Sequence, residues 1–218
     1  MATANKFNID RAFEKLQPLI EKLDAPVVEF VAQQKNDPFR ILIATILSAR
    51  TNDKITNRVI EKLFAQIKDF AALDKLSVEE IEKLIYPVGF YRQKAVQLKK
   101  LPTTIREQFG GIIPSEIDQL VKLPGVGRKT ANLVRAVAFG KPAICVDTHV
   151  HRISNRWGYV RTKTPFATEI ALRKKLPARY WMKINHYLVV FGQTICRPVN
   201  PKCNSCQLND ICPKINVG

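Results

Sequence analysis

The chain has 218 residues, of which 46% are hydrophobic, and its 35 basic and 19 acidic residues give a formal net charge of +16. No apolar run approaches the roughly 20 residues that a membrane-spanning helix needs, and Met1–Asp10 lacks the long apolar stretch of a signal peptide, so an integral membrane protein is excluded and secretion is disfavoured. Basic side chains occur along nearly the whole length, which predicts a folded surface that binds phosphates such as those of nucleic acid; solubility alone is the plainer alternative.

Helical periodicity begins near the N-terminus. Four apolar residues recur there at helical spacing: Phe13, Leu16, Ile20 and Leu23. We expect Asp10 to cap this helix and Pro18 to bend it. Pro38 can open a second helix, Phe39–Ala49, whose side chains are apolar on nearly every side, so this helix is predicted to be buried.

The rest of the chain also reads as helix. Ser77 and Glu80 form a capping-box pattern ahead of an apolar periodic stretch. Further helices are expected at Arg92–Lys100, Ser115–Leu123, Arg128–Phe139, Thr148–Trp157, Pro165–Leu176 and Arg179–Phe191. Only Ala143–Val146 resembles a strand, and one strand cannot make a sheet, so the fold class is predicted to be all-α.

A glycine-containing turn separates two of these helices. The motif reads Leu123-Pro124-Gly125-Val126-Gly127-Arg128-Lys129-Thr130-Ala131-Asn132. Pro124 ends the first helix, and the two glycines permit a tight turn and a close approach of the DNA backbone. The second helix would then present its N-terminal N–H groups to a phosphate. This pattern favours a helix–hairpin–helix that binds DNA without regard to sequence; a plain helical turn is the alternative.

Lys129 lies in the first turn of the helix after this hairpin. The positive end of the helix dipole and the neighbouring Arg128 both disfavour an ammonium group there. A lysine so placed can become a nucleophilic amine near neutral pH. The alternative is a simple salt contact with phosphate, and a nearby carboxylate would favour the catalytic interpretation.

Asp147 is the candidate for that carboxylate. It follows the extended segment Ala143–Val146 and precedes the helix expected to begin at Thr148. An aspartate in this position is also typical of a helix N-cap, so capping is the structural alternative. Cys145, within the extended segment, is interpreted as a buried and inert thiol.

Four cysteines lie close together near the C-terminus. They are spaced as Cys196-x6-Cys203-x2-Cys206-x5-Cys212, within seventeen residues. Structural zinc sites usually have two short ligand pairs, whereas this segment has one pair and two single cysteines. A cubane iron–sulfur cluster offers four iron corners to such a loop. The spacing favours an iron–sulfur cluster, with zinc and disulfides as alternatives.

Together these residues resemble the endonuclease III family of base-excision DNA glycosylases, and the resemblance covers almost the whole chain. The stretches that carry it are Ile46–Asp53, Val88–Ala95, the hairpin, Val146–Arg152 and the four cysteines. The family implies an all-α, two-lobed helix–hairpin–helix fold with a C-terminal 4Fe–4S cluster loop. By resemblance, residues 31–141 form a six-helix barrel, and 1–30 with 142–218 form a discontinuous cluster domain.

The resemblance implies a bifunctional glycosylase and abasic-site lyase. A damaged base is flipped out of the duplex before its glycosidic bond is attacked. Lys129 matches the nucleophile that attacks C1′, releases the base and leaves a Schiff base, after which β-elimination cuts the strand. Asp147 matches the carboxylate that stabilises positive charge on the sugar. Cys196, Cys203, Cys206 and Cys212 match the ligands of one 4Fe–4S cluster.

The same resemblance suggests residues that contact DNA. Val88 and Phe90 match a loop that pushes apolar side chains into the duplex, although core packing is the alternative for Phe90. Arg50 stands where bacterial members commonly carry Gln in the gap-filling position, and arginine could fill the same space. His149 is expected beside Asp147. The remaining contacts are expected from the hairpin: Leu123, Gly125, Val126, Gly127, Arg128 and Thr130.

Three other functions fit the sequence less well. An adenine-mismatch glycosylase lacks lysine at the hairpin position and carries a further C-terminal domain, for which a chain ending at Gly218 has no room. Lys129 also disfavours a monofunctional thymine-mismatch glycosylase. A non-catalytic iron–sulfur DNA-binding protein would not need both Lys129 and Asp147. The expected protein is therefore a monomer in the cytoplasm, associated with the nucleoid, that binds double-stranded DNA with a damaged base, most often an oxidised pyrimidine, or an abasic site.

Overall fold

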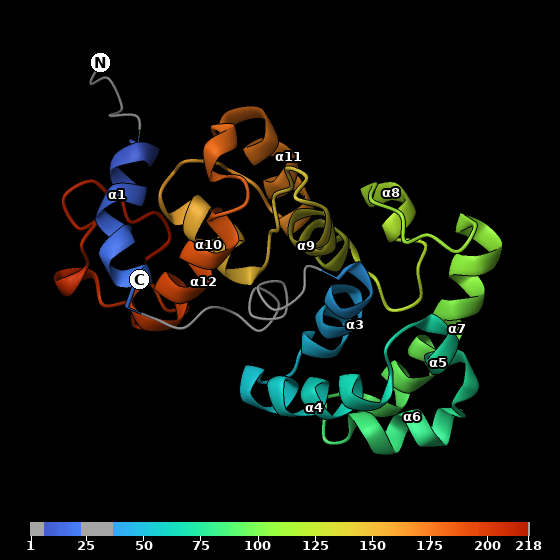
Figure 1. Cartoon of the computed structure of the whole chain (residues 1–218). Helices are drawn as coiled ribbons and strands as arrows, with labels where there is room; N and C mark the ends of the chain where they lie inside the picture. The colour runs from blue at the N-terminus through green and yellow to red at the C-terminus, as the bar shows by residue number, and fades with distance from the viewer. Residues whose placement is uncertain (1–6, 23–36, 218) are drawn as a thin grey trace. The chain divides into compact units, whose positions relative to one another are not determined.

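The computed structural model describes residues 7–22 and 37–217, and all regular secondary structure in these residues is helical (Figure 1). The all-α prediction is therefore confirmed for the described part of the chain. No helix there combines the length and the apolar character needed to cross a membrane.

Two compact units divide the described residues. One unit comprises 37–143, and the other comprises 7–22 together with 144–217. The first expected domain boundary, between residues 30 and 31, lies outside the described residues, as does Leu23 of the first apolar pattern. The assignment of 31–141 and of 1–30 plus 142–218 as domains stays a prediction.

The unit of residues 37–143 is built around one buried helix. Its helices are α3 (Pro38–Ser48), α4 (Asp53–Gln66), α5 (Phe70–Lys75), α6 (Val78–Ile85), α7 (Tyr91–Phe109), α8 (Ile117–Leu120) and α9 (Arg128–Phe139). Every residue of α3 from Phe39 to Leu47 is buried except Arg40, and α3 packs against α4, α7 and α9. This helix is apolar on nearly all sides because neighbours surround it, as its sequence predicts.

The second unit joins the N-terminal helix to the C-terminal part of the chain. Its elements are α1 (Ile9–Ile20), α10 (Thr148–Arg156), α11 (Pro165–Lys175), the 3₁₀ turn η1 (Ala178–Tyr180), α12 (Ile184–Thr194) and the 3₁₀ turn η2 (Cys203–Ser205). Helix α12 packs against α1 and α10, and these three lie side by side in Figure 1. The buried rings of Trp157 and Phe191 fill the core between them. This packing positions the N-terminus of α10 and the cysteine segment.

Two helix starts agree with the sequence rules. The Ser77 hydroxyl accepts the backbone N–H of Glu80, and the Glu80 carboxylate accepts the backbone N–H of Ser77 at 2.7 Å, so the capping box is confirmed. Asp37 caps α3 through the N–H of Phe39, and Pro38 occupies the first turn, where no intrahelical N–H is needed.

The predicted start of the first helix is wrong by two residues. Asn8 is the N-cap, and its side chain accepts the backbone N–H of Arg11 at 3.0 Å. Asp10 lies inside the helix and accepts the hydroxyl hydrogen of Tyr180 at 2.7 Å. The Asp10 carboxylate, which was expected to cap the helix, thus binds a residue distant in the sequence instead. Pro18 is accommodated within α1.

Several predicted elements have different lengths. The expected helix Ser115–Leu123 shortens to α8, whereas Arg92–Lys100 extends to all of α7 despite Pro102. The expected helix Arg179–Phe191 divides into η1 and α12. Segment 143–146 is irregular, so the one strand-like prediction is wrong. Helices α4 and α5 were not predicted, although Asn52 and Asp69 cap them and are readable N-cap signals.

Candidate functional site

The hairpin between α8 and α9 is a tight turn whose apolar residues point inward. Leu123 and Val126 are buried in the core, and the N–H of Val126 donates to the carbonyl of Leu123 at 3.1 Å. Gly125 has φ +79°, and a Cβ there would lie 2.9 Å from Oε1 of Gln97. The positive φ favours glycine here, whereas the contact with the flexible end of Gln97 could be relieved by movement of that side chain. The side chains of Leu123 and Val126 therefore support the turn from within.

The N-terminus of α9 has no side-chain cap. Gly127 is its N-cap residue, and a Cβ added at Gly127 would meet only open space. The first helical N–H groups need acceptors, and this terminus carries the positive end of the helix dipole. Asn132, which is buried, donates to the carbonyl of Arg128 at 3.0 Å and braces the first turn. The arrangement can receive an anion such as a phosphate.

Lys129 lies in this first turn with an exposed side chain. Its neighbour Arg128 is 3.9 Å from a carboxylate oxygen of Asp118, a solvent-exposed ion pair of the weak kind. The side chain of Lys129 is thus exposed and not buried between the two helices. Proximity to a helix terminus is the feature that distinguishes this amine.

Asp147 begins α10 and is its N-cap. One carboxylate oxygen, Oδ1, accepts the backbone N–H of His149 at 2.8 Å and of Val150 at 2.9 Å. The capping interpretation of Asp147 is thus correct. A half-buried carboxylate with two backbone donors is held in one orientation, which suits a group that must stabilise charge on a bound molecule. Capping and a catalytic role are compatible.

A basic row follows Asp147 along one face of α10. His149, Arg152 and Arg156 are three and four residues apart, so their side chains share that face. Nη2 of Arg152 lies 3.1 Å from Nδ1 of His149 and donates to the carbonyl of Cys196 at 2.9 Å. Burial lowers the pKa of Arg152. Sequence reasoning missed both arginines, although their helical spacing was readable.

Gly192 of α12 makes room for this row. A Cβ at Gly192 would collide with Nδ1 of His149 and would lie 2.9 Å from Nη2 of Arg152. Helix interiors disfavour glycine, so its presence in α12 has a packing reason. No sequence pattern indicated this residue, because the contact joins segments forty or more positions apart.

Two exposed residues with left-handed backbone lie after α3 and before α7. Arg50 has φ 57° and Phe90 has φ 58°, and the guanidinium carbon of Arg50 is 4.9 Å from the centroid of the Phe90 ring. Phe90 is 57% exposed, so ordinary core packing does not account for it. Val88, two residues earlier, is buried instead. Of this loop, the structure thus presents Phe90 and not Val88 at the surface.

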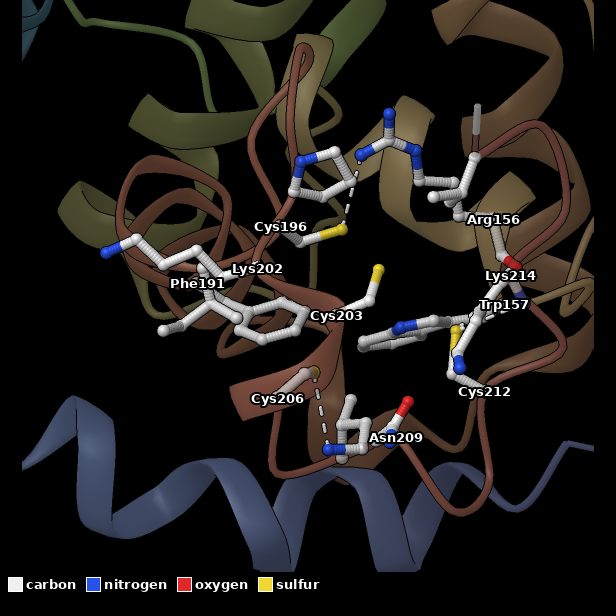
Figure 2. A pocket seen from close by; sticks show the side chains of 14 residues that line it. Arg156, Trp157, Phe191, Cys196, Lys202, Cys203, Cys206, Asn209, Cys212 and Lys214 are labelled. Carbon is white, nitrogen blue, oxygen red and sulfur yellow. Dashed lines mark hydrogen bonds between the residues drawn. The ribbon is translucent and has the colours of Figure 1, made fainter.

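The four C-terminal cysteines line one pocket (Figure 2). Trp157, Phe191 and Leu208 supply its apolar wall. Burial raises the pKa of the Cys206 and Cys212 thiols. All four are thiols in the described part of the chain, and Cys145 is buried outside this pocket. Among the described residues, no three His, Cys, Asp or Glu side chains are arranged to hold a single metal ion.

Hydrogen-bond donors point at the sulfurs of this pocket. Backbone N–H groups of Leu208 and Lys214 lie 3.4 Å from Sγ of Cys206 and of Cys212. Nη1 of Arg156 lies 3.5 Å from Sγ of Cys196, and the same guanidinium binds the carbonyls of Arg197 and Pro198. Such donors stabilise anionic sulfur. Four thiols with N–H donors and an apolar wall fit a polynuclear cluster in which each thiolate binds a different iron.

Comparison with known proteins agrees with these features. Residues 43–178, more than half of the chain, match the HhH-GPD superfamily of base excision DNA repair proteins. The chain is 46% identical to endonuclease III of Thermotoga maritima over 89% of this chain and 92% of that protein. It is 43% identical to endonuclease III of Bacillus subtilis over 81% of each chain.

A solved structure is similar over nearly the whole chain. The structure of a trapped endonuclease III–DNA covalent intermediate, with an estranged adenine, matches with a TM-score of 0.82 and 36% identity, covering 94% of each chain. The match includes both described units of the chain, since it covers nearly all residues.

Proposed function

The chain belongs to the endonuclease III family within the HhH-GPD superfamily, and from that membership we propose that it is a bifunctional DNA glycosylase and abasic-site lyase of base excision repair. The observation that carries the proposal is the exposed Lys129 in the uncapped first turn of α9. A hairpin whose helix terminus can bind phosphate, with an amine beside it, would serve a glycosylase that is also a lyase. Both are present in this segment.

Lys129 is the nucleophile of the proposed reaction. The flipped nucleotide exposes C1′ of its sugar, and Nζ of Lys129 forms a bond to that carbon while the glycosidic C–N bond breaks and the base leaves with a proton. The sugar ring then opens to a Schiff base. Loss of a proton from C2′ and cleavage of the C3′–O bond cut the strand by β-elimination. Hydrolysis of the imine restores the amine.

Asp147 is the proposed partner carboxylate. Positive charge develops on the sugar as the base departs, and a fixed carboxylate stabilises it. The two N–H donors of His149 and Val150 hold Asp147 so that it need not reorganise when the charge forms. Its role as N-cap therefore serves its proposed role in catalysis.

The proposed substrate is double-stranded DNA that contains a damaged base, an oxidised pyrimidine in the first instance, or an abasic site. The net charge of +16 supports binding that weakens steeply with salt. Hairpin contacts are proposed through Gly125, Gly127, Arg128 and Thr130, with Leu123 and Val126 contributing backbone because their side chains are buried. A monomer associated with cytoplasmic DNA fits this function.

One 4Fe–4S cluster is proposed at the cysteine pocket. Cys196, Cys203, Cys206 and Cys212 would hold it, and it would cross-link the C-terminal segment covalently when bound. Arg156 and the backbone donors of Leu208 and Lys214 would stabilise the thiolate form of the ligands. Iron and sulfide analysis with the visible absorption spectrum tests this assignment against zinc.

Borohydride trapping on a duplex with one abasic site tests the proposed activity. The parent protein is expected to give a covalent adduct, and Lys129→Gln is expected to give none, because glutamine cannot form an imine. Lys122→Gln is the matched control, since it removes one positive charge from the same hairpin and should retain the adduct. A parent without an adduct would favour a monofunctional glycosylase if it still releases bases, or a DNA-binding protein if it does not.

A further inference from the structure

Lys94 is a buried lysine that the proposed reaction does not use. It lies in the first turn of α7, and only 6% of its surface is exposed. Burial lowers its pKa to about 8. A buried lysine is disfavoured unless its ammonium group is well hydrogen-bonded, so the partners of Lys94 indicate why it is there.

The ammonium group of Lys94 binds the end of another helix. Nζ donates to the carbonyl of Leu47 at 2.8 Å, to the carbonyl of Ala49 at 2.7 Å and to Oγ1 of Thr51 at 3.2 Å. These three acceptors match the three N–H donors of an ammonium group. The last carbonyls of a helix lack intrahelical partners, and the negative end of the dipole attracts a cation. Lys94 therefore caps the C-terminus of α3 from α7.

Thr51 connects this cap to the loop before α7. Its Oγ1 accepts from Lys94 and from the backbone N–H of Gly89, each at 3.2 Å, and donates to the carbonyl of Ala49 at 3.4 Å. The Thr51 hydroxyl thus uses its single O–H donor and both of its acceptor lone pairs. The loop after α3 and the loop before α7 share this single junction.

The two loops touch at Gly89. A Cβ at Gly89 would lie 2.7 Å from the carbonyl oxygen of Arg50, so only glycine allows this approach. Arg50 and Phe90 flank the contact. Both have positive φ angles, and both side chains lie at the surface. The carbonyl of Phe90 accepts the backbone N–H of Lys94 at 3.0 Å, which is the first helical hydrogen bond of α7 and fixes Phe90 at the start of that helix.

We propose that Lys94 is a positioning residue that joins the two loops into one rigid wedge, in which the stacked Arg50 and Phe90 enter the DNA duplex together. The proposal rests on the proposed function, because a wedge is needed only if a base leaves the stack. Left-handed backbone at two non-glycine residues persists when surrounding contacts hold it. Lys94 and Thr51 supply those contacts. The Arg50 guanidinium stacks on the Phe90 ring, so the two loops together present one surface that is both apolar and positively charged.

The test uses Lys94→Met in the full-length protein, which keeps an unbranched side chain only one atom shorter and removes the ammonium donors. Lys100→Met is the matched control, since Lys100 lies on the same helix and is exposed. The DNA is a duplex with a tetrahydrofuran abasic analogue opposite 2-aminopurine, whose fluorescence reports the unstacked base without any chemistry. The parent and Lys100→Met are expected to raise the fluorescence, and Lys94→Met is expected to lose most of that rise.

A second readout separates positioning from stability. Single-turnover base release by Lys94→Met is expected to fall about tenfold or more, as misplacement of a positioning group does. Phe90→Ala should add little in the Lys94→Met background, because the wedge is already disordered. Additive effects of the two substitutions, or a parent-like fluorescence rise in folded Lys94→Met, would overturn the proposal.

Thr51→Val keeps the proposal testable if Lys94→Met does not fold. It removes the bridge to Gly89 and leaves the two carbonyl bonds of Lys94 in place, so a reduced fluorescence rise is expected, and a full rise would refute the shared junction. Borohydride trapping of the parent distinguishes this outcome from failure of the proposed function. If the parent forms the borohydride adduct while the Lys94 and Thr51 variants unstack the base as well as the parent does, the wedge proposal is wrong and the proposed function stands.

Discussion

The N-termini of α9 and α10 carry the two proposed catalytic residues and are built in opposite ways. Gly127 leaves the start of α9 without a side-chain cap, whereas Asp147 closes the start of α10 with its own carboxylate. An uncapped terminus leaves its dipole for an external anion, and a capped one instead fixes a carboxylate in place. The start of α9 is thus suited to binding an anion, and the start of α10 is suited to holding a carboxylate in position.

The far ends of the same two helices also differ. Arg135, near the end of α9, pairs with the exposed carboxylate of Glu116 at 2.6 Å. Arg156, at the end of α10, is buried and binds carbonyls of the cysteine segment. Surface ion pairs contribute little to stability, whereas buried charged hydrogen bonds are costly to break. The end of α10 is therefore expected to depend more on Arg156 than the end of α9 depends on Arg135.

The largest expected effect comes from Asp147, where capping and charge can be separated. Asn caps helices as well as Asp does, so Asp147→Asn should keep the melting temperature while base release falls by roughly 100-fold or more. Asp147→Ala should lose the same activity and also about 1 kcal/mol of stability. Single-turnover base release and thermal unfolding measure the two effects. Full activity in Asp147→Asn would reduce the residue to a cap.

Gly192→Ala tests the packing that holds the α10 face. The new methyl group would collide with His149 and crowd Arg152, so stability should fall by about 1–3 kcal/mol. Thermal or denaturant unfolding measures this loss. Alanine is the better helix former by up to about 1 kcal/mol, so a gain in stability would show that His149 and Arg152 move aside without cost.

Gly127→Asp converts the start of α9 into the kind of terminus that α10 has. The new carboxylate would cap the helix and repel phosphate, so affinity for an abasic duplex should fall about tenfold while thermal stability is kept or rises. Gly127→Asn caps without charge and serves as the control. Fluorescence anisotropy at several salt concentrations measures binding. Equal affinities for the two variants would mean that no phosphate approaches this terminus.

The smallest expected effect concerns the far end of α9 in acid. Hydrogen bonds from Lys141 and Arg135 lower the pKa of Glu116 from its usual 4.5 to about 2. The stability that this carboxylate contributes is therefore present above pH 4.5 and lost as the pH falls toward 2. Glu116→Gln should flatten the dependence of unfolding free energy on pH in that interval only slightly, because the pair is exposed. An unchanged pH dependence would show that the pair contributes nothing.

Local chemistry in the sequence determined much of the fold and of the site. The capping box of Ser77 and Glu80 and the glycine turn at Gly125 act over three or four residues, so they can be read without tertiary information. The cysteine spacing likewise brings four thiols to one pocket. Helix lengths were harder to predict from the sequence. Helix α7 continues through Pro102, because packing in the core outweighs one missing hydrogen bond.

Tertiary structure decided which side chains are buried and which partners they take. Asp10 was readable as a cap, yet Tyr180 takes its carboxylate and Asn8 caps the helix instead. Phe90 is apolar but exposed, and Lys94 is charged but buried, because the C-terminus of α3 supplies acceptors 45 and 47 positions away. Composition and periodicity describe neighbours along the chain, and burial depends on neighbours in space. A charge that is stable only beside distant carbonyls becomes visible only when the chain is folded.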